Sequence, residues 1–93
     1  MNQNVSAVLR EAAKTIEDYG WVQRQMTNRE GGCCLFWAIE MSGSTPQDRW
    51  EAVEFMTKYL MMDIIRWNDT VAKDKEHVIE ALEAAADVGM FVK

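Results

Sequence analysis

Residues 5–20, VSAVLREAAKTIEDYG, carry the pattern that decides the fold class of this chain. Apolar side chains recur at steps of three and four residues from Val5 to Tyr19, and charged side chains fall on the opposite side. This spacing is typical of an amphipathic helix. Gly20 follows directly, and glycine is the residue that most easily takes the left-handed conformation at a helix end. The stretch therefore predicts a helix over residues 5–19.

Three further helical patterns follow, and they predict helices over residues 33–41, 46–61 and 75–87. The clearest start is at Thr45, which is suited to cap a helix that begins with Pro46 and has Asp48 in its first turn. Asp74 is the expected cap of the last helix, and Gly89 is its expected end.

The stretch Met62–Asp69 fits either an extension of the third helix or an extended connector. We expect a connector that ends in a turn at Asn68-Asp69, because both side chains readily hydrogen-bond nearby backbone. The predicted fold is then a single all-α domain over residues 1–93, with four helices in an orthogonal or bundle-like arrangement. An irregular segment around residues 21–32 separates the first two helices.

Length and composition favour one folded domain and exclude several classes of partner. A chain of 93 residues with 48% hydrophobic residues is long enough for one core and too short for two. The net charge of −5 makes nucleic acid and anionic membrane surfaces poor partners. The first residues lack the features of a secretory signal, and no apolar stretch is long enough to span a bilayer. We therefore expect a cytoplasmic protein.

Three short motifs make the sequence recognisable: Tyr19-Gly20-Trp21, then Gly32 to Cys34 with Ala38-Ile39 after it, then Trp67-Asn68-Asp69 ahead of a helix. With these motifs the chain resembles, over roughly residues 8–86, a family of small uncharacterised proteins from actinobacteria and their phages. The resemblance implies a cytoplasmic, often phage-encoded protein and implies no enzyme activity. Trp37 departs from the pattern, because a small residue, usually glycine, is expected just before the alanine of the cysteine helix.

The residues of these motifs are interpreted first as structural. Trp67 is expected to be anchored in the core, with Asn68 and Asp69 pairing with backbone groups at a turn or a helix end. Trp21 is expected to be a hydrophobic plug next to the glycine cap at Gly20. The alternative is that the Asp69 carboxylate, the Asn68 amide and the tryptophan rings line a small-molecule pocket.

Candidate chemistry centres on Cys34, which follows Gly31-Gly32 near a predicted helix start. Together with His77 and Asp69 it supplies the three residue types of a cysteine hydrolase. Free cysteine is more often buried, however, and Cys34 falls on the apolar side of its helix while His77 falls on a polar face. We therefore expect no catalytic residue.

Other chemical sites are not expected either. Cys33 and Cys34 are neighbours with a single histidine in the whole chain, which does not match the paired spacing of a zinc site, so no metal and no cofactor is expected. Bridging adjacent cysteines is strained, so free thiols in a reducing compartment are expected. Gly31-Gly32 lacks the Lys-Ser/Thr of a phosphate-binding loop, and we expect a loop with positive backbone angles or a close helix approach.

Aromatic residues outside the main apolar stripes indicate a binding surface. The inward stripe of the third predicted helix is expected to contain Trp50, Val53, Met56, Leu60 and Met61. A second stripe lies roughly opposite, formed by Ala52, Phe55 and Tyr59, and on the second helix Phe36 and Trp37 flank Glu40. A helix that is apolar on two sides is either covered on both or binds a partner.

The expected protein-interface residues are therefore four aromatics, Phe36, Trp37, Phe55 and Tyr59. The competing interpretation is that the 21–32 segment and the C-terminal tail cover them. The predicted function is a non-enzymatic interaction module, of the kind a phage accessory protein provides, that binds itself or a host protein and inhibits or redirects it. The alternative is a small-molecule binder or a cysteine-dependent enzyme using Cys34 with Trp67, Asn68 and Asp69.

Overall fold

The computed structural model of the chain describes residues 3–42 and 45–91. Its helices are α1 (Gln3–Tyr19), α2 (Leu35–Glu40), α3 (Pro46–Leu60), α4 (Ile64–Thr70) and α5 (Lys75–Phe91). The all-α class is confirmed. The expected number of four helices is too low by one, because α4 occupies the stretch that was expected to be an extended connector.

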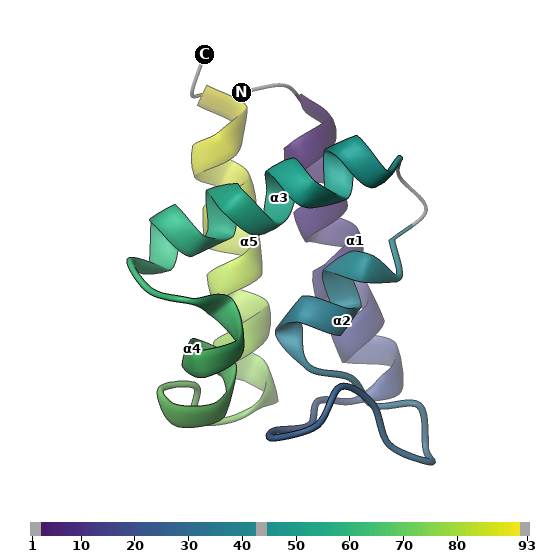
Figure 1. The fold of residues 1–93 in the computed structure, drawn as a ribbon. Coiled ribbons are helices and arrows are strands. Elements are labelled where there is room, and N and C mark those ends of the chain that lie inside the picture. The colour runs from purple at the N-terminus through teal and green to yellow at the C-terminus, as the bar shows by residue number, and fades with distance from the viewer. Residues whose placement is uncertain (1–2, 43–44, 92–93) are drawn as a thin grey trace.

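The helices form two layers (Figure 1). In one layer α1 and α5 lie side by side and run in opposite directions, so that the start of α1 and the end of α5 are at the same end of the molecule. In the other layer α3 crosses over both of them, α2 packs on α1, and α4 packs on α2 and α3. The core between the layers consists of fully or almost fully buried side chains from all five helices, among them Val8, Leu9, Ile16, Leu35, Ile39, Met56, Ile64, Val78 and Leu82.

The predicted helix boundaries that depend on capping residues are largely confirmed. Thr45 Oγ1 accepts a hydrogen bond from the backbone N–H of Asp48 at 3.2 Å, with Pro46 as the first helical residue. Asp74 Oδ1 accepts one from the N–H of His77 at 2.8 Å at the start of α5. Gly20 ends α1 with a φ of +101°, in the left-handed region that favours glycine.

Small residues let α1 and α5 approach each other closely. Ser6 is buried, and its hydroxyl donates to the carbonyl of Ala86 at 2.8 Å. Gly89 lies inside α5, where an added Cβ would come within 3.0 Å of Ser6 Oγ. The expectation that Gly89 ends the last helix is therefore wrong, because this glycine serves the contact between two helices and α5 continues to Phe91.

The break between α3 and α4 has two local causes. Met61 takes a left-handed conformation with φ of +63°, which ends α3. Asp63 then accepts a hydrogen bond from the N–H of Arg66 at 3.0 Å through its carboxylate, which starts a new helix at Ile64. The expected connector over residues 62–69 is therefore wrong, because the Asp63 cap starts a helix there.

The inward face of α3 also differs from the expected stripe. Ala52 and Met56 are fully buried, whereas Trp50 is 59% exposed and Met61 is 89% exposed. The reason is geometric, because α3 crosses both α1 and α5 and buries the short strip of its surface that lies over them. Ala52, assigned to the opposite stripe, is part of that buried strip.

Candidate functional site

The three sequence motifs meet at the side chain of Asn68, which is fully buried on α4. Its Oδ1 accepts hydrogen bonds from Trp21 Nε1 at 2.7 Å and from the backbone N–H of Leu35 at 3.0 Å. Its Nδ2 donates to the carbonyl of Val22 and to Asp69 Oδ1, both at 3.0 Å. All four hydrogen-bonding positions of the amide are thus used. Asn68 therefore joins the 21–34 segment and the start of α2 to α4.

The residues on either side of Asn68 complete this connection. Asp69 Oδ1 also accepts from the backbone N–H of Arg24 at 2.8 Å, and Arg24 has a left-handed φ of +62°. Gln23 Nε2 donates to the carbonyls of Asn68 at 3.0 Å and Ala72 at 3.3 Å. These bonds satisfy backbone groups that the end of α4 leaves without a helical partner. The expectation that Asn68 and Asp69 pair with backbone is confirmed.

The 21–34 segment is held as an ordered loop by a second, local set of bonds. Asn28 Oδ1 accepts from the N–H groups of Glu30 at 3.1 Å and Gly32 at 2.8 Å. Gly31 has a φ of +91°, and a Cβ on Gly32 would meet the Asn28 side chain at 3.2 Å. The expected positive backbone angle is confirmed at Gly31, whereas the close neighbours of Gly32 are Asn28 and Val22 of the same loop and not a helix.

Trp67 is buried with only 6% of its surface exposed, as expected. Its ring meets the ring of His77 edge to face, with 5.1 Å between the centroids. His77 Nδ1 accepts a hydrogen bond from the backbone N–H of Lys73 at 3.1 Å. The histidine therefore supports the turn before α5.

Cys34 is used as a structural residue at the start of α2. Its Sγ accepts a hydrogen bond from the backbone N–H of Trp37 at 3.4 Å, in the position of a helix N-cap. Burial raises the pKa of the Cys34 thiol, backbone N–H groups partly offset this, and the Asp69 carboxylate adds to the rise. Burial, followed by the charge of Cys34, raises the pKa of Cys33 to about 11. Both thiols are free, and at neutral pH both are protonated and weakly nucleophilic.

A small hollow does lie over Cys34 and Asp69. It has a volume of about 180 Å³, and its other lining residues are Arg24, Gln25, Met26 and Ile65. Ligand pockets typically have volumes of about 300–1,000 Å³, so this hollow fits only a few non-hydrogen atoms. Trp67, Asn68 and His77 do not line it. The residues of the hydrolase hypothesis are therefore not assembled around one open site.

The four expected interface residues do not line one common hollow. Phe36 and Trp37 are neighbours on α2, and each lines a different hollow. Phe55 is half-buried, and its ring is the close neighbour of Gly89 on α5. Tyr59 lies one turn further along α3 and is 39% exposed. Phe55 and Tyr59 line neither of the two hollows beside α2.

The two hollows lie along two adjacent rows of α2, because residues four apart share one face of a helix. Trp37 and Met41 line a hollow of about 490 Å³ together with residues from α1 and the 21–34 segment, which are Thr15, Tyr19, Thr27 and Gly31. Phe36 and Glu40 line a hollow of about 270 Å³ together with residues of α3, which are Pro46, Arg49, Trp50 and Val53.

Three exposed apolar side chains at these hollows were not predicted as interface residues. Tyr19 is 61% exposed, Met41 is 57% exposed and Trp50 is 59% exposed. Helical periodicity assigned Tyr19 and Trp50 to inward faces. Tyr19 is the last residue of α1, and Trp50 lies on the face of α3 roughly opposite the buried Ala52.

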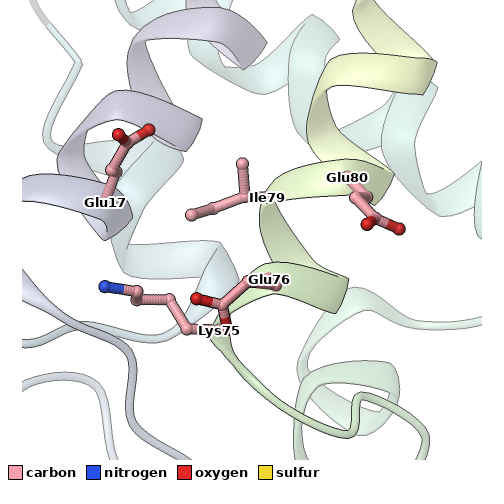
Figure 2. Close-up of a pocket in the computed structure, with 5 residues that line it drawn as sticks. All are labelled: Glu17, Lys75, Glu76, Ile79 and Glu80. Carbon is pink, nitrogen blue, oxygen red and sulfur yellow. The ribbon is translucent and has the colours of Figure 1, made fainter.

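A further hollow, between the end of α1 and the start of α5, is acidic. It has a volume of about 340 Å³ and is lined by Glu17, Lys75, Glu76, Ile79 and Glu80. Figure 2 shows Ile79 reaching from α5 toward α1, while Glu80 points away from Glu17. Its carboxylates do not converge on one point. Within residues 3–42 and 45–91 there is no group of three or more histidine, cysteine or acidic residues arranged to hold a metal ion.

Comparison with known proteins identifies the family and nothing more specific. No described helix is both long and apolar enough to cross a membrane. No curated protein and no solved structure matches the chain. A family model matches residues 1–88, and the chain belongs to that family, the family of unknown function DUF6197.

Proposed function

We propose that this protein is a non-enzymatic protein-interaction module that binds through the surface around α2. We call this the α2 surface and define it by the apolar residues of the two hollows beside α2, which are Tyr19, Phe36, Trp37, Met41, Trp50 and Val53. The proposal keeps Phe36 and Trp37 from the four aromatics expected from the sequence. It does not include Phe55 and Tyr59, which line neither hollow.

The observation that carries the proposal is the exposure of large apolar side chains around two hollows on one short helix. Tyr19, Met41 and Trp50 each expose more than half of their surface. Tryptophan, tyrosine and methionine are enriched in protein interfaces, and a few such residues usually provide most of the binding free energy. Isolated exposed apolar residues are common, but a cluster around a concave surface is typical of a binding site.

The proposed function is non-enzymatic, and the hydrogen bonds made by Cys34 and Asn68 support this choice. Cys34 Sγ accepts a hydrogen bond from a helix N–H, and Asn68 has no free hydrogen-bonding position. Groups used in this way contribute to holding the fold. The resemblance noted in the sequence supports a phage accessory protein that binds a host protein and inhibits or redirects it. Two free thiols suit a reducing compartment, so we propose that it acts in the cytoplasm.

The test is a capture experiment with the full chain carrying an affinity tag. The wild type, Trp37→Ala and Val88→Ala are each incubated with an actinobacterial lysate and with a differently tagged copy of the same chain. Val88 is a suitable control because it is 43% exposed on α5, outside the α2 surface. We expect Trp37→Ala to lose at least about tenfold of the captured protein, as interface hot spots do, while Val88→Ala retains it.

Thermal melting of all three proteins is measured in parallel. If Trp37→Ala folds and captures the same proteins in the same amounts as the wild type, the α2 surface is not the binding surface.

A second candidate function is the binding of a very small ligand, supported by the hollow at Cys34 and Asp69. Its test is an NMR titration with fragments of a few non-hydrogen atoms, comparing the wild type with Ile65→Lys, which fills the hollow from an exposed position. Saturable shifts at Cys34 and Asp69 that vanish in Ile65→Lys would support this function. Titrations without such shifts would remove it.

A further inference from the structure

The hollow lined by Arg24, Cys34 and Asp69, which we call the Asp69 hollow, brings an acidic and a basic side chain to one small volume. Asp69, near the end of α4, is half-buried, and Arg24, in the 21–34 segment, is exposed. The backbone N–H of Arg24 donates to Asp69 Oδ1 at 2.8 Å, so the two residues are fixed next to each other. The hollow therefore offers an anionic and a cationic group side by side.

Both charged groups keep binding capacity that the fold does not use. Asp69 Oδ1 accepts from Arg24 N–H and from Asn68 Nδ2, but Asp69 Oδ2 accepts no hydrogen bond from residues 3–42 or 45–91. Over the same residues the Arg24 guanidinium has no hydrogen-bond or ion-pair partner, so the two side chains do not form an ion pair with each other. A carboxylate oxygen and a planar guanidinium are thus available to a ligand.

We propose that the Asp69 hollow binds a small zwitterionic amino acid of about the size of alanine. The ligand carboxylate pairs with the Arg24 guanidinium, and the ligand ammonium donates to Asp69 Oδ2. The proposal rests on the second candidate function, the binding of a very small ligand, and names the chemical class of that ligand.

The size and the apolar part of the hollow favour a ligand of this class. The volume is about 180 Å³, which admits an amino acid with a short side chain and excludes nucleotides and other ligands that need a pocket of the usual size. Met26, Ile65 and the buried Cys34 line the hollow beside the charged groups. A methyl group can contact these apolar side chains while the charged groups of the ligand reach Arg24 and Asp69.

The two opposite charges select a zwitterion over a ligand with one charge or none. A simple anion would pair with Arg24 but approach the Asp69 carboxylate, and a simple cation would meet the opposite conflict at Arg24. The same holds for a glutamate or lysine side chain of a protein partner. An uncharged ligand would displace water from both charged groups without replacing its hydrogen bonds. A zwitterion satisfies both groups at once.

The first test uses the wild-type protein and three small molecules that differ only in their charged groups. Alanine carries both groups, propionate lacks the ammonium, and ethylammonium lacks the carboxylate. Each is titrated from micromolar to millimolar concentration at constant ionic strength, and NMR follows the isotope-labelled protein. We expect saturable shifts at Arg24, Cys34 and Asp69 with alanine. Each analogue should bind at least about tenfold more weakly, because it loses one charge-assisted hydrogen-bonded contact.

The second test removes the charges of the protein one at a time. Arg24→Gln removes the guanidinium, and Asp69→Asn removes the carboxylate charge but keeps an oxygen that can accept from the Arg24 N–H. Each should weaken alanine binding at least about tenfold, whereas Arg29→Gln should leave it unchanged. Arg29 is a matched control because it is an exposed arginine of the same segment that does not line the hollow.

The Arg24 variant also gives a readout that a change in stability does not imitate. Without the guanidinium, the carboxylate of alanine has no partner, so Arg24→Gln should bind alanine no better than ethylammonium. Thermal melting of all variants is measured in parallel. If Asp69→Asn melts at a lower temperature, Arg24→Gln decides, because the exposed Arg24 side chain has no partner among the described residues.

The results separate this proposal from the second candidate function. If uncharged fragments shift Cys34 and Asp69 while alanine does not, the amino acid is wrong and the hollow is still a binding site. If neither produces saturable shifts there, both are overturned. Alanine binding that Arg24→Gln leaves unchanged, or that propionate or ethylammonium equals, also overturns the zwitterion. Loss of binding in Arg24→Gln with retention in Arg29→Gln supports it.

Discussion

Trp21 Nε1 donates a hydrogen bond of 2.7 Å to Asn68 Oδ1, joining two residues that are 47 positions apart in the chain. This bond connects the segment after α1 to α4 and so explains why two separate tryptophan motifs occur in one small domain. Because the same oxygen accepts from the N–H of Leu35, the start of α2 depends on it as well. The position of α2, and with it the proposed binding surface, therefore depends on a buried amide on another helix.

The first prediction concerns that amide. Asn68→Ala should lower the free energy of unfolding by about 2–4 kcal/mol, because it leaves buried backbone and indole groups without a hydrogen-bond partner. The matched control is Asn4→Ala, which removes an exposed amide from α1 and should change stability by less than about 0.5 kcal/mol. Urea denaturation measures both. Equal stabilities of the two variants would contradict the structural role of Asn68.

The second prediction compares the same substitution at a buried and an exposed tryptophan. Trp67→Ala should cost about 3–5 kcal/mol, because it removes a ring that is only 6% exposed and leaves a cavity against His77. Trp50→Ala should cost about 1 kcal/mol or less, since most of its ring is already in solvent. Thermal melting of dilute protein, where association does not contribute, gives the comparison. A Trp50→Ala variant that melts as low as Trp67→Ala would show that Trp50 belongs to the core.

The third prediction concerns the two thiols. Native protein at neutral pH should react with a thiol reagent much more slowly than the unfolded chain, because burial raises the pKa of both thiols and limits access to them. The rates are followed by absorbance with and without denaturant. Fast modification of Cys34 in the native protein would restore the nucleophile hypothesis.

The same pKa shift predicts a loss of stability in alkali. The folded state keeps the Cys33 proton to a higher pH than the unfolded state does, so the stabilisation is complete below pH 9.0 and is lost as the pH rises toward about 11. Lysine and tyrosine also titrate in this range, so the wild type is compared with Cys33→Ala over the same pH series. We expect the decrease to be shallower in Cys33→Ala. If the stability of both proteins falls equally with pH, the folded protein does not disfavour the Cys33 thiolate.

The fourth prediction uses the left-handed residue that ends α3. Met61→Gly should raise the free energy of unfolding by about 0.5–1 kcal/mol, because glycine adopts a φ of +63° without steric cost and the methionine side chain is 89% exposed. Met41→Gly is the control, since Met41 ends α2 with a φ of −85° and is also exposed. Met41→Gly should not raise the free energy of unfolding. If the free energy of unfolding rises in both variants, the cause is the loss of an exposed methionine side chain. If it rises in neither, the backbone at residue 61 is not strained.

Several features of the fold could be predicted because their causes are local. The N-cap at Thr45, Pro46 after it and the glycine after Tyr19 act within one helical turn, and each functions as expected. The burial of Trp67 could be predicted from its size and its place in a motif. The Asp63 cap is equally local, so the start of α4 is also encoded within one helical turn of the sequence.

The candidate site was less accessible from the sequence. That Asn68 and Asp69 pair with backbone was expected, but their partners, Val22, Arg24 and Leu35, are far away in the chain. No spacing rule relates those positions. Gly89 resembled a helix end, and only the close approach of α1 shows that it is a contact residue.

The sequence alone determined that this chain is helical and where most of its helices begin. These properties depend on capping, periodicity and composition, which act over a few residues. The tertiary structure alone decided which apolar faces are covered. Trp50 and Ala52 lie on roughly opposite faces of one helix, and the first stands in solvent while the second is fully buried, because α3 packs on α1 and α5 with the face that contains Ala52 and Met56.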